Sequence, residues 1–186
     1  MANQARFFYQ DENAPKPNRP NSVGTVVLIE CDGKLLFEHR TDSEVWAIIG
    51  GGLGTQEALA EGAAREVWEE TGIQVDPKDL TFFGIYDDPS RIASYPDGNI
   101  FRILTIAYRL RLSEIPVLRC SNESRELRFF SGKALADIAI ARTHVPILKD
   151  YLASIIKVSE KSHGEENDIG RDGQQGRDFP EGTAVV

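Results

Sequence analysis

The stretch Gly50–Ile73 reads GGGLGTQEALAEGAAREVWEETGI and decides the fold. Its three leading glycines, Gly50–Gly52, disfavour a helix or strand interior because glycine loses the most backbone entropy on ordering. They predict a tight loop in which the backbone closely approaches another group. Thr55 is a candidate N-cap and Gly72 a candidate residue just after a helix end, so the spacing predicts a helix between them.

The predicted helix has an apolar face and, next to it, an acidic ridge. At about 100° per residue, the apolar face collects Leu59, Ala60, Ala63, Ala64 and Val67. Residues three or four apart are surface neighbours, and the ridge consists of Glu66, Glu69 and Glu70. Like charges at this spacing repel, and the helix dipole disfavours them further at the C-terminal end. A Mg²⁺ ion would offset both effects, whereas the alternative is an ordinary solvated acidic face.

The spacing of the fixed residues decides between these alternatives. The stretch resembles the box of the Nudix hydrolases, whose defining positions are occupied by Gly51, Glu57, Arg65-Glu66-Val67, Glu69-Glu70 and Gly72-Ile73. Two common accompaniments outside the defining pattern are absent. Gly54 stands where a glutamate is often found, and Ile49 stands where a proline usually precedes the glycines.

This resemblance implies an α/β protein with the Nudix fold, an α/β/α sandwich around a mixed β-sheet. It also implies hydrolysis of a diphosphate linkage with Mg²⁺ or Mn²⁺ as the metal. Carried over to this chain, the metal ligands would be Glu66, Glu69, Glu70 and the Gly50 carbonyl. Arg65 and Glu57 would form a pair that holds the loop to the helix and orients the carboxylates. Glu66 is also a candidate general base.

A further glutamate reaches the metals or acts as the base in many members of the family. Glu123 and Glu126 both fit this role, as catalytic residues or, for Glu126, as a metal ligand, and the sequence does not choose between them. The alternative is that both are surface glutamates. A non-catalytic module that senses a nucleotide is another reading, although such sensors can lose box carboxylates and none is missing here.

Composition and charge limit the partners. The chain of 186 residues has a net charge of −8, which argues against a nucleic-acid polymer as a partner. No apolar run is long enough to span a membrane, and no signal pattern opens the chain, so a cytoplasmic location is expected. Cys31 and Cys120 are expected to be reduced thiols, with a disulfide between them as the alternative. The expected partner is a small nucleoside diphosphate derivative, and a homodimer is a candidate assembly.

Three parts are expected along the chain. Residues 1–19 read as an extended N-terminal arm, in which Phe7–Tyr9 would dock on its own domain or on a second subunit. Residues 20–157 would form the Nudix hydrolase domain. Residues 158–186 read as an acidic, disordered tail, since Ser159–Val186 carries seven acids against three Lys or Arg.

The remaining pattern predicts strands and one further helix. Strands are expected at Thr25–Glu30, Lys34–Arg40, Thr81–Tyr86, Phe101–Leu112 and Arg125–Phe130. The first two should be joined by a hairpin turn at Asp32-Gly33. Phe101–Leu112 alternates so cleanly that one of its faces should be solvated. A packed helix is expected over Thr143–Lys157, with Thr143 as its N-cap.

Candidates for substrate contact lie at a strand end and in a loop. Arg40 could meet a phosphate or could be a solvated strand end. The 13 residues Asp87–Asn99 read as a functional loop, and Pro89 lies sixteen residues after Ile73. A proline near that position resembles ADP-ribose-hydrolysing Nudix enzymes and favours ADP-ribose or a similar derivative, with a (d)NTP as the alternative substrate. Further candidates for contact with a phosphate or base are Arg91, Tyr95 and Arg102.

Overall fold

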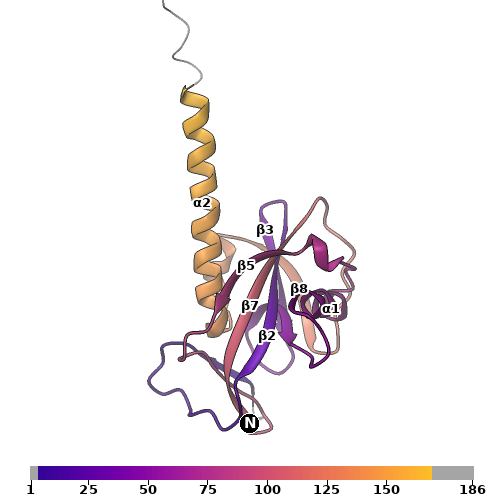
Figure 1. The fold of residues 1–186 in the computed structure, drawn as a ribbon, viewed down its shortest axis with the longest axis vertical. Helices are drawn as coiled ribbons and strands as arrows, with labels where there is room; N and C mark the ends of the chain where they lie inside the picture. The colour runs from indigo at the N-terminus through magenta and orange to yellow at the C-terminus, as the bar shows by residue number, and fades with distance from the viewer. Residues whose placement is uncertain (1–3, 169–186) are drawn as a thin grey trace, which may run out of the picture. The chain divides into compact units, whose positions relative to one another are not determined.

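A mixed β-sheet forms the body of the fold (Figure 1). The computed structural model describes residues 4–168, and the side chains of residues 4–156. The strands are β1 (Arg6–Phe8), β2 (Ser22–Cys31), β3 (Lys34–Arg40), β4 (Trp46–Gly52), β5 (Thr81–Tyr86), β6 (Ile92–Ser94), β7 (Ile100–Leu112) and β8 (Ser124–Ser131). The helices are α1 (Leu59–Thr71) and α2 (Val145–Asp168), and the short 3₁₀ turns are η1 (Pro77–Asp79), η2 (Ala134–Asp137) and η3 (Arg142–His144). Among the described strands the order is β1-β6-β7-β2-β4-β3-β8, and β5 pairs with β7.

Strand β2 lies inside the sheet because both of its faces are apolar. Val27 and Leu28, which point to opposite faces of the strand, are 0% and 1% exposed. The strand pairs with β7 in parallel and with β3 and β4 antiparallel. Asp32 and Gly33 join β2 to β3 with φ angles of 49° and 68°, the positive values that a tight hairpin turn requires. The predicted hairpin and the strand over Lys34–Arg40 are therefore confirmed.

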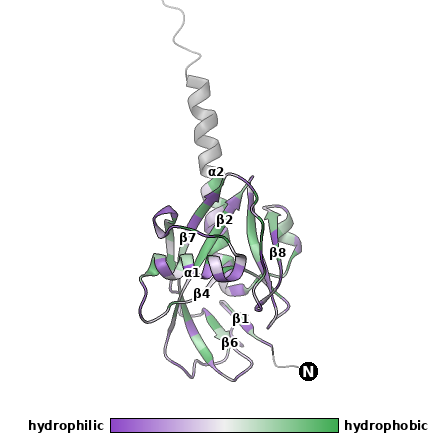
Figure 2. Ribbon diagram, turned by 90° about the vertical axis from the view of Figure 1, so that its right-hand side faces the viewer, coloured by the Kyte–Doolittle hydropathy of each residue, from purple (hydrophilic) through white to green (hydrophobic). Residues whose placement is uncertain are grey.

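Helix α1 packs its apolar face on the sheet, as predicted. Ala63 and Val67 are completely buried in one cluster with Ile49 and Ile106. Leu59, predicted on the same face, is 39% exposed because it lies in the first turn of the helix. Figure 2 shows hydrophobic residues, in green, along the strands of the sheet. The α/β class with a mixed sheet is thus confirmed.

The two ends of α1 were predicted with different success. Gly72 ends the helix in the left-handed conformation (φ 77°), and its N–H donates to Trp68 O at 2.9 Å, as expected. The helix begins at Leu59 with Ala58 as N-cap, so the Thr55 prediction was wrong. The Ala58 N–H donates to the Glu61 carboxylate at 2.9 Å. Glu57 holds the preceding residues in a loop by accepting the Gly54 N–H, which delays the helix start.

The loop predicted at Gly50–Gly52 is instead the last part of strand β4. These residues pair with Gly24–Val26 of β2. Gly50 has φ 144°, and a Cβ atom built there would lie 2.1 Å from Thr25 O. The glycines are needed for a close backbone approach, as predicted, but the approaching group is the neighbouring strand. Strand pairing thus offsets the entropic cost of ordering three glycines.

The N-terminal segment is not an unpacked arm. Strand β1 pairs with β6, and the Ala5 N–H donates to Asp42 O at 2.8 Å. The Phe7 ring meets the Tyr95 ring edge-on at 6.4 Å, so the aromatic residues dock on their own domain. The partner strand β6 lies inside the segment Asp87–Asn99, which was predicted to be a loop throughout. Short strands of three residues carry too little periodicity to be recognised in the sequence.

Strand β7 is present as predicted, but its second face is not simply solvated. Thr105 and Ala107 are buried on that face, and Thr105 accepts a hydrogen bond from Arg91. Farther along, Arg109 and Arg111 each contact Glu30 of β2 at 3.0 Å. The alternation in the sequence marked polar residues correctly but did not reveal that they are covered by other polar groups.

Helix α2 differs from its prediction at both ends. Thr143 lies in the turn η3, and the helix starts at Val145 and runs to Asp168. The part 159–168 of the predicted disordered tail is therefore helical, while 169–186 lies outside the described residues. The chain divides between Lys149 and Asp150 into two units, and the domain boundaries at residues 20 and 157 stay predictions. Across the described residues, no helix combines the length and apolar character needed to cross a membrane.

Candidate active site

Arg65, on the outer side of α1, is the centre of a network of carboxylates. Its Nε and Nη2 donate to the two Glu57 oxygens at 2.9 and 2.7 Å. Its Nη1 donates to Glu66 and Glu69 at 2.8 Å each, and Nη2 also reaches Gly52 O at 3.0 Å. The predicted Arg65–Glu57 pair therefore forms and ties the loop to the helix. The hydrogen bond from Arg65 lowers the pKa of Glu57 to about 2.

Glu70 lies on the inner side of the same helix. Its side chain is 5% exposed, and its Oε2 accepts the Gly50 N–H at 2.8 Å. Burial raises the pKa of Glu70 well above its usual range, and the nearby charge of Glu38 raises it further. Burial also raises the pKa of Glu66, although Arg65 opposes that effect. The Glu66 carboxylate lies against Gly51, where an added Cβ would be 2.7 Å from Oε1.

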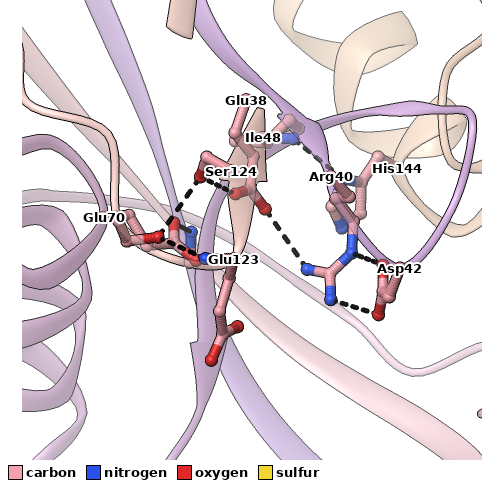
Figure 3. Close-up of polar contacts among 10 residues, drawn as sticks. Glu38, Arg40, Asp42, Ile48, Glu70, Glu123, Ser124 and His144 are labelled. Carbon is pink, nitrogen blue, oxygen red and sulfur yellow. Dashed lines mark hydrogen bonds and ion pairs between the residues drawn. The ribbon is translucent and has the colours of Figure 1, made fainter. Parts of the chain in front are cut away.

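Glu38 of β3 completes this cluster and was not identified from the sequence. It is completely buried, and it accepts hydrogen bonds from Ser124 Oγ at 2.6 Å and Arg40 Nη1 at 3.2 Å (Figure 3). Burial is the main cause that raises the pKa of Glu38. Alternation along β3 places Glu38 on the same face as Leu36, which is the one signal in the sequence for an inward glutamate.

Arg40 is neither solvated nor fully available to a phosphate. Its Nε and Nη2 donate to the two oxygens of Asp42 at 2.8 Å each, and its side chain is only 16% exposed. The neighbouring His39 stacks on Trp46 with ring centroids 5.0 Å apart. Arg40 instead forms a half-buried ion pair with Asp42, an arrangement that neither of the two predictions included.

The structure places the two candidate glutamates near β8, Glu123 and Glu126, in different surroundings. The charge of Glu123 adds to the effect of burial in raising the pKa of Glu38 and of Glu66, so Glu123 lies beside the cluster. The Glu123 carbonyl accepts the Thr41 N–H at 2.8 Å, which fixes the backbone there. Glu126 is instead bound by Arg128, whose guanidinium lies over the Trp46 ring. Of the two candidates, the geometry favours Glu123 as a partner of the carboxylates.

A cavity of about 110 Å³ lies beside Gly50–Gly52, the last three residues of β4, which we call the glycine strand. Its lining includes Gly50–Gly52, and two of the predicted substrate residues, Arg40 and Tyr95, are part of it. The full lining consists of Phe7, Ser22, Gly24, Thr25, Val26, Arg40, Ala47, Gly50, Gly51, Gly52, Ala93, Tyr95, Ile103, Thr105, Thr143 and His144. A wider, open depression of about 610 Å³ contains no member of the carboxylate cluster.

The other predicted substrate residues, Arg91, Arg102 and Pro89, do not line this cavity. Arg91 is 1% exposed and donates through Nη2 to Thr105 Oγ1 at 2.7 Å, behind the cavity wall. Burial lowers the pKa of Arg91 to about 10. Arg102 donates to Asp87 O at 2.7 Å and so holds the loop after β5. Pro89 is exposed in that loop and does not line the cavity.

The carboxylates supply the oxygen ligands that a divalent cation prefers. Among the described residues, no three Asp, Glu, His or Cys side chains are arranged to hold a metal ion. Arg65 occupies one oxygen each of Glu66 and Glu69 in this arrangement. Glu38 and Glu70 are buried together with Arg40 as a nearby cation that favours their charged forms. Such an excess of buried, hard oxygen donors suits Mg²⁺ or Mn²⁺.

His144 in the cavity wall should make stability depend on pH. Its Nδ1 accepts the Ile48 N–H at 3.1 Å, and burial, with the charges of Arg91 and Arg40, lowers its pKa to about 3. The unfolded chain binds a proton at about pH 6.5 and the folded chain does not, so stability falls as pH drops from 6.5 toward 3. We expect a loss of about 1 kcal/mol per pH unit from this group.

Urea unfolding between pH 4.5 and 7 measures this slope. In His144→Gln the amide oxygen can still accept the Ile48 N–H, and the slope should become smaller by that amount. Equal slopes for the two proteins would contradict the assignment. The comparison isolates His144 because the buried carboxylates, whose pKa values are raised, are present in both proteins.

Comparisons with known proteins identify the family. The model of the NUDIX domain matches residues 18–151, so the chain belongs to the Nudix family. It is 44% identical over 85 residues to a MutT-like protein of Streptomyces ambofaciens, covering 46% of this chain and 54% of that protein. It is 30% identical over 128 residues to an ADP-ribose pyrophosphatase of Methanocaldococcus jannaschii, covering 67% and 69%. The chain thus spans about half the length of the first of these relatives.

Solved structures share the fold. The NUDIX domain of Shewanella oneidensis NrtR, solved in complex with ADP ribose, superposes with a TM-score of 0.60. The alignment covers 78% of this chain and 93% of that domain, with 14% sequence identity. At that identity the likeness extends to the fold alone.

Proposed function

We propose that this protein is a metal-dependent Nudix pyrophosphohydrolase that cleaves the diphosphate linkage of a nucleoside diphosphate derivative, ADP-ribose or a similar compound. The observation that carries the proposal is the group of buried carboxylates set against the glycine strand, beside a cavity lined by that same strand. The similarity to a relative named as an ADP-ribose pyrophosphatase supports the substrate class.

The box residues would hold the metal. The proposed ligands are Glu66, Glu69, Glu70 and the Gly50 carbonyl. Glu126, the further ligand that the sequence suggested, is the weaker candidate because Arg128 binds its carboxylate. When bound, Mg²⁺ or Mn²⁺ neutralises the diphosphate oxygens and lowers the pKa of a bound water. Arg65 would release Glu66 and Glu69 to the metal while its bidentate contact with Glu57 keeps the loop in place.

Proton transfer from the attacking water needs a nearby carboxylate. Glu66, the candidate from the box, is half-buried, and its raised pKa brings it closer to the working pH, which favours a general base. Glu123 is the competing base, because its charge acts on the same cluster. Glu126 is the weaker candidate, since Arg128 binds its carboxylate. Around the substrate, Arg40 and Tyr95 would contact it in the cavity, whereas Arg91, Arg102 and Pro89 would shape the wall and loop.

A substrate panel tests the proposal. With Mg²⁺ and with Mn²⁺, kcat/KM should be higher for ADP-ribose than for any (d)NTP, because the small cavity beside Gly50–Gly52 can accept a group joined to the diphosphate. Phosphate-containing products identify the bond that breaks. A clear preference for triphosphates would contradict the substrate assignment, and the absence of any turnover with either metal would contradict the enzyme class.

A non-catalytic module that binds a nucleotide is the second candidate. The contacts of Arg65 with Glu66 and Glu69 favour it, because they occupy oxygens that a metal would need. Calorimetric binding of ADP-ribose without release of AMP would support this candidate. The complete set of box carboxylates argues for catalysis instead. A homodimer and a cytoplasmic location stay predictions.

A further inference from the structure

A buried hydroxyl in the cavity has no partner of its own. Thr25 on β2 is 1% exposed, and its Oγ1 forms no hydrogen bond with any described residue. Thr25 also lines the cavity beside the glycine strand. A buried hydroxyl without a partner destabilises the folded state, so valine, which has the same shape, would be the better residue for stability alone. The position of this hydroxyl therefore points to a group that enters the cavity.

Two further residues that line the cavity have a hydrogen-bond donor that is not used by the contacts described above. Thr105 Oγ1 accepts from Arg91 Nη2 at 2.7 Å, which leaves the hydroxyl proton of Thr105 to donate elsewhere. His144 Nδ1 accepts the Ile48 N–H, so the proton of the neutral ring is on Nε2. Both residues line the cavity. The wall thus offers donors from Thr25, Thr105 and His144 to a group that is rich in oxygen.

The hydroxyl groups around the cavity suit a sugar. No aspartate or glutamate is among the described residues that line it. Arg40 lines it, but two of its nitrogens are bound by Asp42. Besides Thr25, Thr105 and the His144 imidazole, the lining contains the hydroxyls of Ser22, Tyr95 and Thr143. Sugar hydroxyls, which both accept and donate, match this hydroxyl-rich wall. Arg91 behind the wall has Nε and Nη1 without a partner among the described residues, so an anion is the competing ligand, and inorganic phosphate tests it.

The size and the position of the cavity identify which part of a substrate it would take. A cavity of about 150 Å³ can hold benzene, so a volume of about 110 Å³ suits one small ring and is too little for a nucleoside. Gly50 and Gly51 line the cavity and also contact Glu70 and Glu66. A diphosphate held at the carboxylates therefore has one end within reach of the cavity.

We propose that this cavity binds the sugar ring that is joined to the far phosphate of the substrate, through hydrogen bonds from Thr25, Thr105 and His144 to its hydroxyl oxygens. The proposal rests on the proposed function and adds the orientation of the substrate. The sugar lies in the cavity, the diphosphate at the carboxylates, and the nucleoside outside on the open side of the site.

The Thr25→Val variant tests the orientation by binding of the two products, which needs no turnover. Calorimetry with ribose 5-phosphate and with AMP, each in Mg²⁺, should give about tenfold weaker binding of ribose 5-phosphate and unchanged binding of AMP, as expected for one lost hydrogen bond. The melting temperature of the free variant should be equal to or higher than that of the wild type. Inorganic phosphate, as a third probe, should bind equally to both proteins.

Thr81→Val is the matched control, because Thr81 is an exposed strand threonine outside this cavity, and it should change none of these values. Weaker binding of AMP with unchanged binding of ribose 5-phosphate would overturn the orientation. Unchanged binding of both products would remove Thr25 from the site, and weaker binding of inorganic phosphate would make the cavity an anion site. Failure of the proposed function is distinct, since it appears as a wild-type protein that does not hydrolyse ADP-ribose.

Discussion

Glu70→Gln should lower kcat/KM for ADP-ribose by about 10²-fold or more. Glu70 is a proposed metal ligand whose Oε2 already contacts the Gly50 N–H, so its position is fixed by the glycine strand. Glutamine keeps the shape and can still accept that N–H, but it lacks the charge that holds a cation. Glu69→Gln should have a similar effect, although Glu69 is half-exposed. The measurement is steady-state kinetics over a range of Mg²⁺ concentrations.

The same change should stabilise the protein without metal. A buried carboxylate near Glu38 is unfavourable, and removing its charge should raise the free energy of unfolding by about 1 kcal/mol. Opposite signs for activity and stability distinguish a functional carboxylate from a structural one. Glu61→Gln is the control, because Glu61 lies on the same helix and contacts only its N-terminal end. Full activity of Glu70→Gln at limiting Mg²⁺ would remove the proposed metal ligand.

Gly50→Ala should be the most damaging substitution for the fold. The added Cβ would lie 2.1 Å from Thr25 O, a backbone atom that cannot move independently of β2, and the φ of 144° is strained for alanine. We expect a loss of about 3 kcal/mol or more in the free energy of unfolding. Urea denaturation compares this variant with the wild type. A loss below about 1 kcal/mol would mean that β4 can shift away from β2.

The two following glycines should separate stability from activity. In Gly51→Ala the Cβ would meet the Glu66 carboxylate at 2.7 Å, and a flexible side chain can move away. Its stability should change little, while its activity should fall because Glu66 is displaced. Gly52→Ala is the control, since nothing lies within 4 Å of the added atom. The same melting temperature in all three variants would contradict the described strand pairing.

Local chemistry explains which parts of the fold were predictable. Gly72 ends α1 because glycine readily adopts the left-handed conformation that terminates a helix. The hairpin at Asp32-Gly33 was predictable for a similar reason, since both residues tolerate the positive φ angles that its turn requires. The Thr55 prediction failed because the side chain of Glu57 keeps the chain in a loop. The short strands β1 and β6 were missed because their apolar pattern covers three residues each.

The sequence by itself determined the box, and with it the carboxylates of α1, the Arg65–Glu57 pair and the family. These features depend on residues close together in the chain, where helical spacing fixes which side chains are neighbours. Only the tertiary structure decided that Glu38 is buried beside Glu70, that Glu123 lies near them while Arg128 binds Glu126, and that the Thr25 hydroxyl is left without a partner. Burial and contact between distant strands follow from how the sheet pairs, which no local pattern encodes.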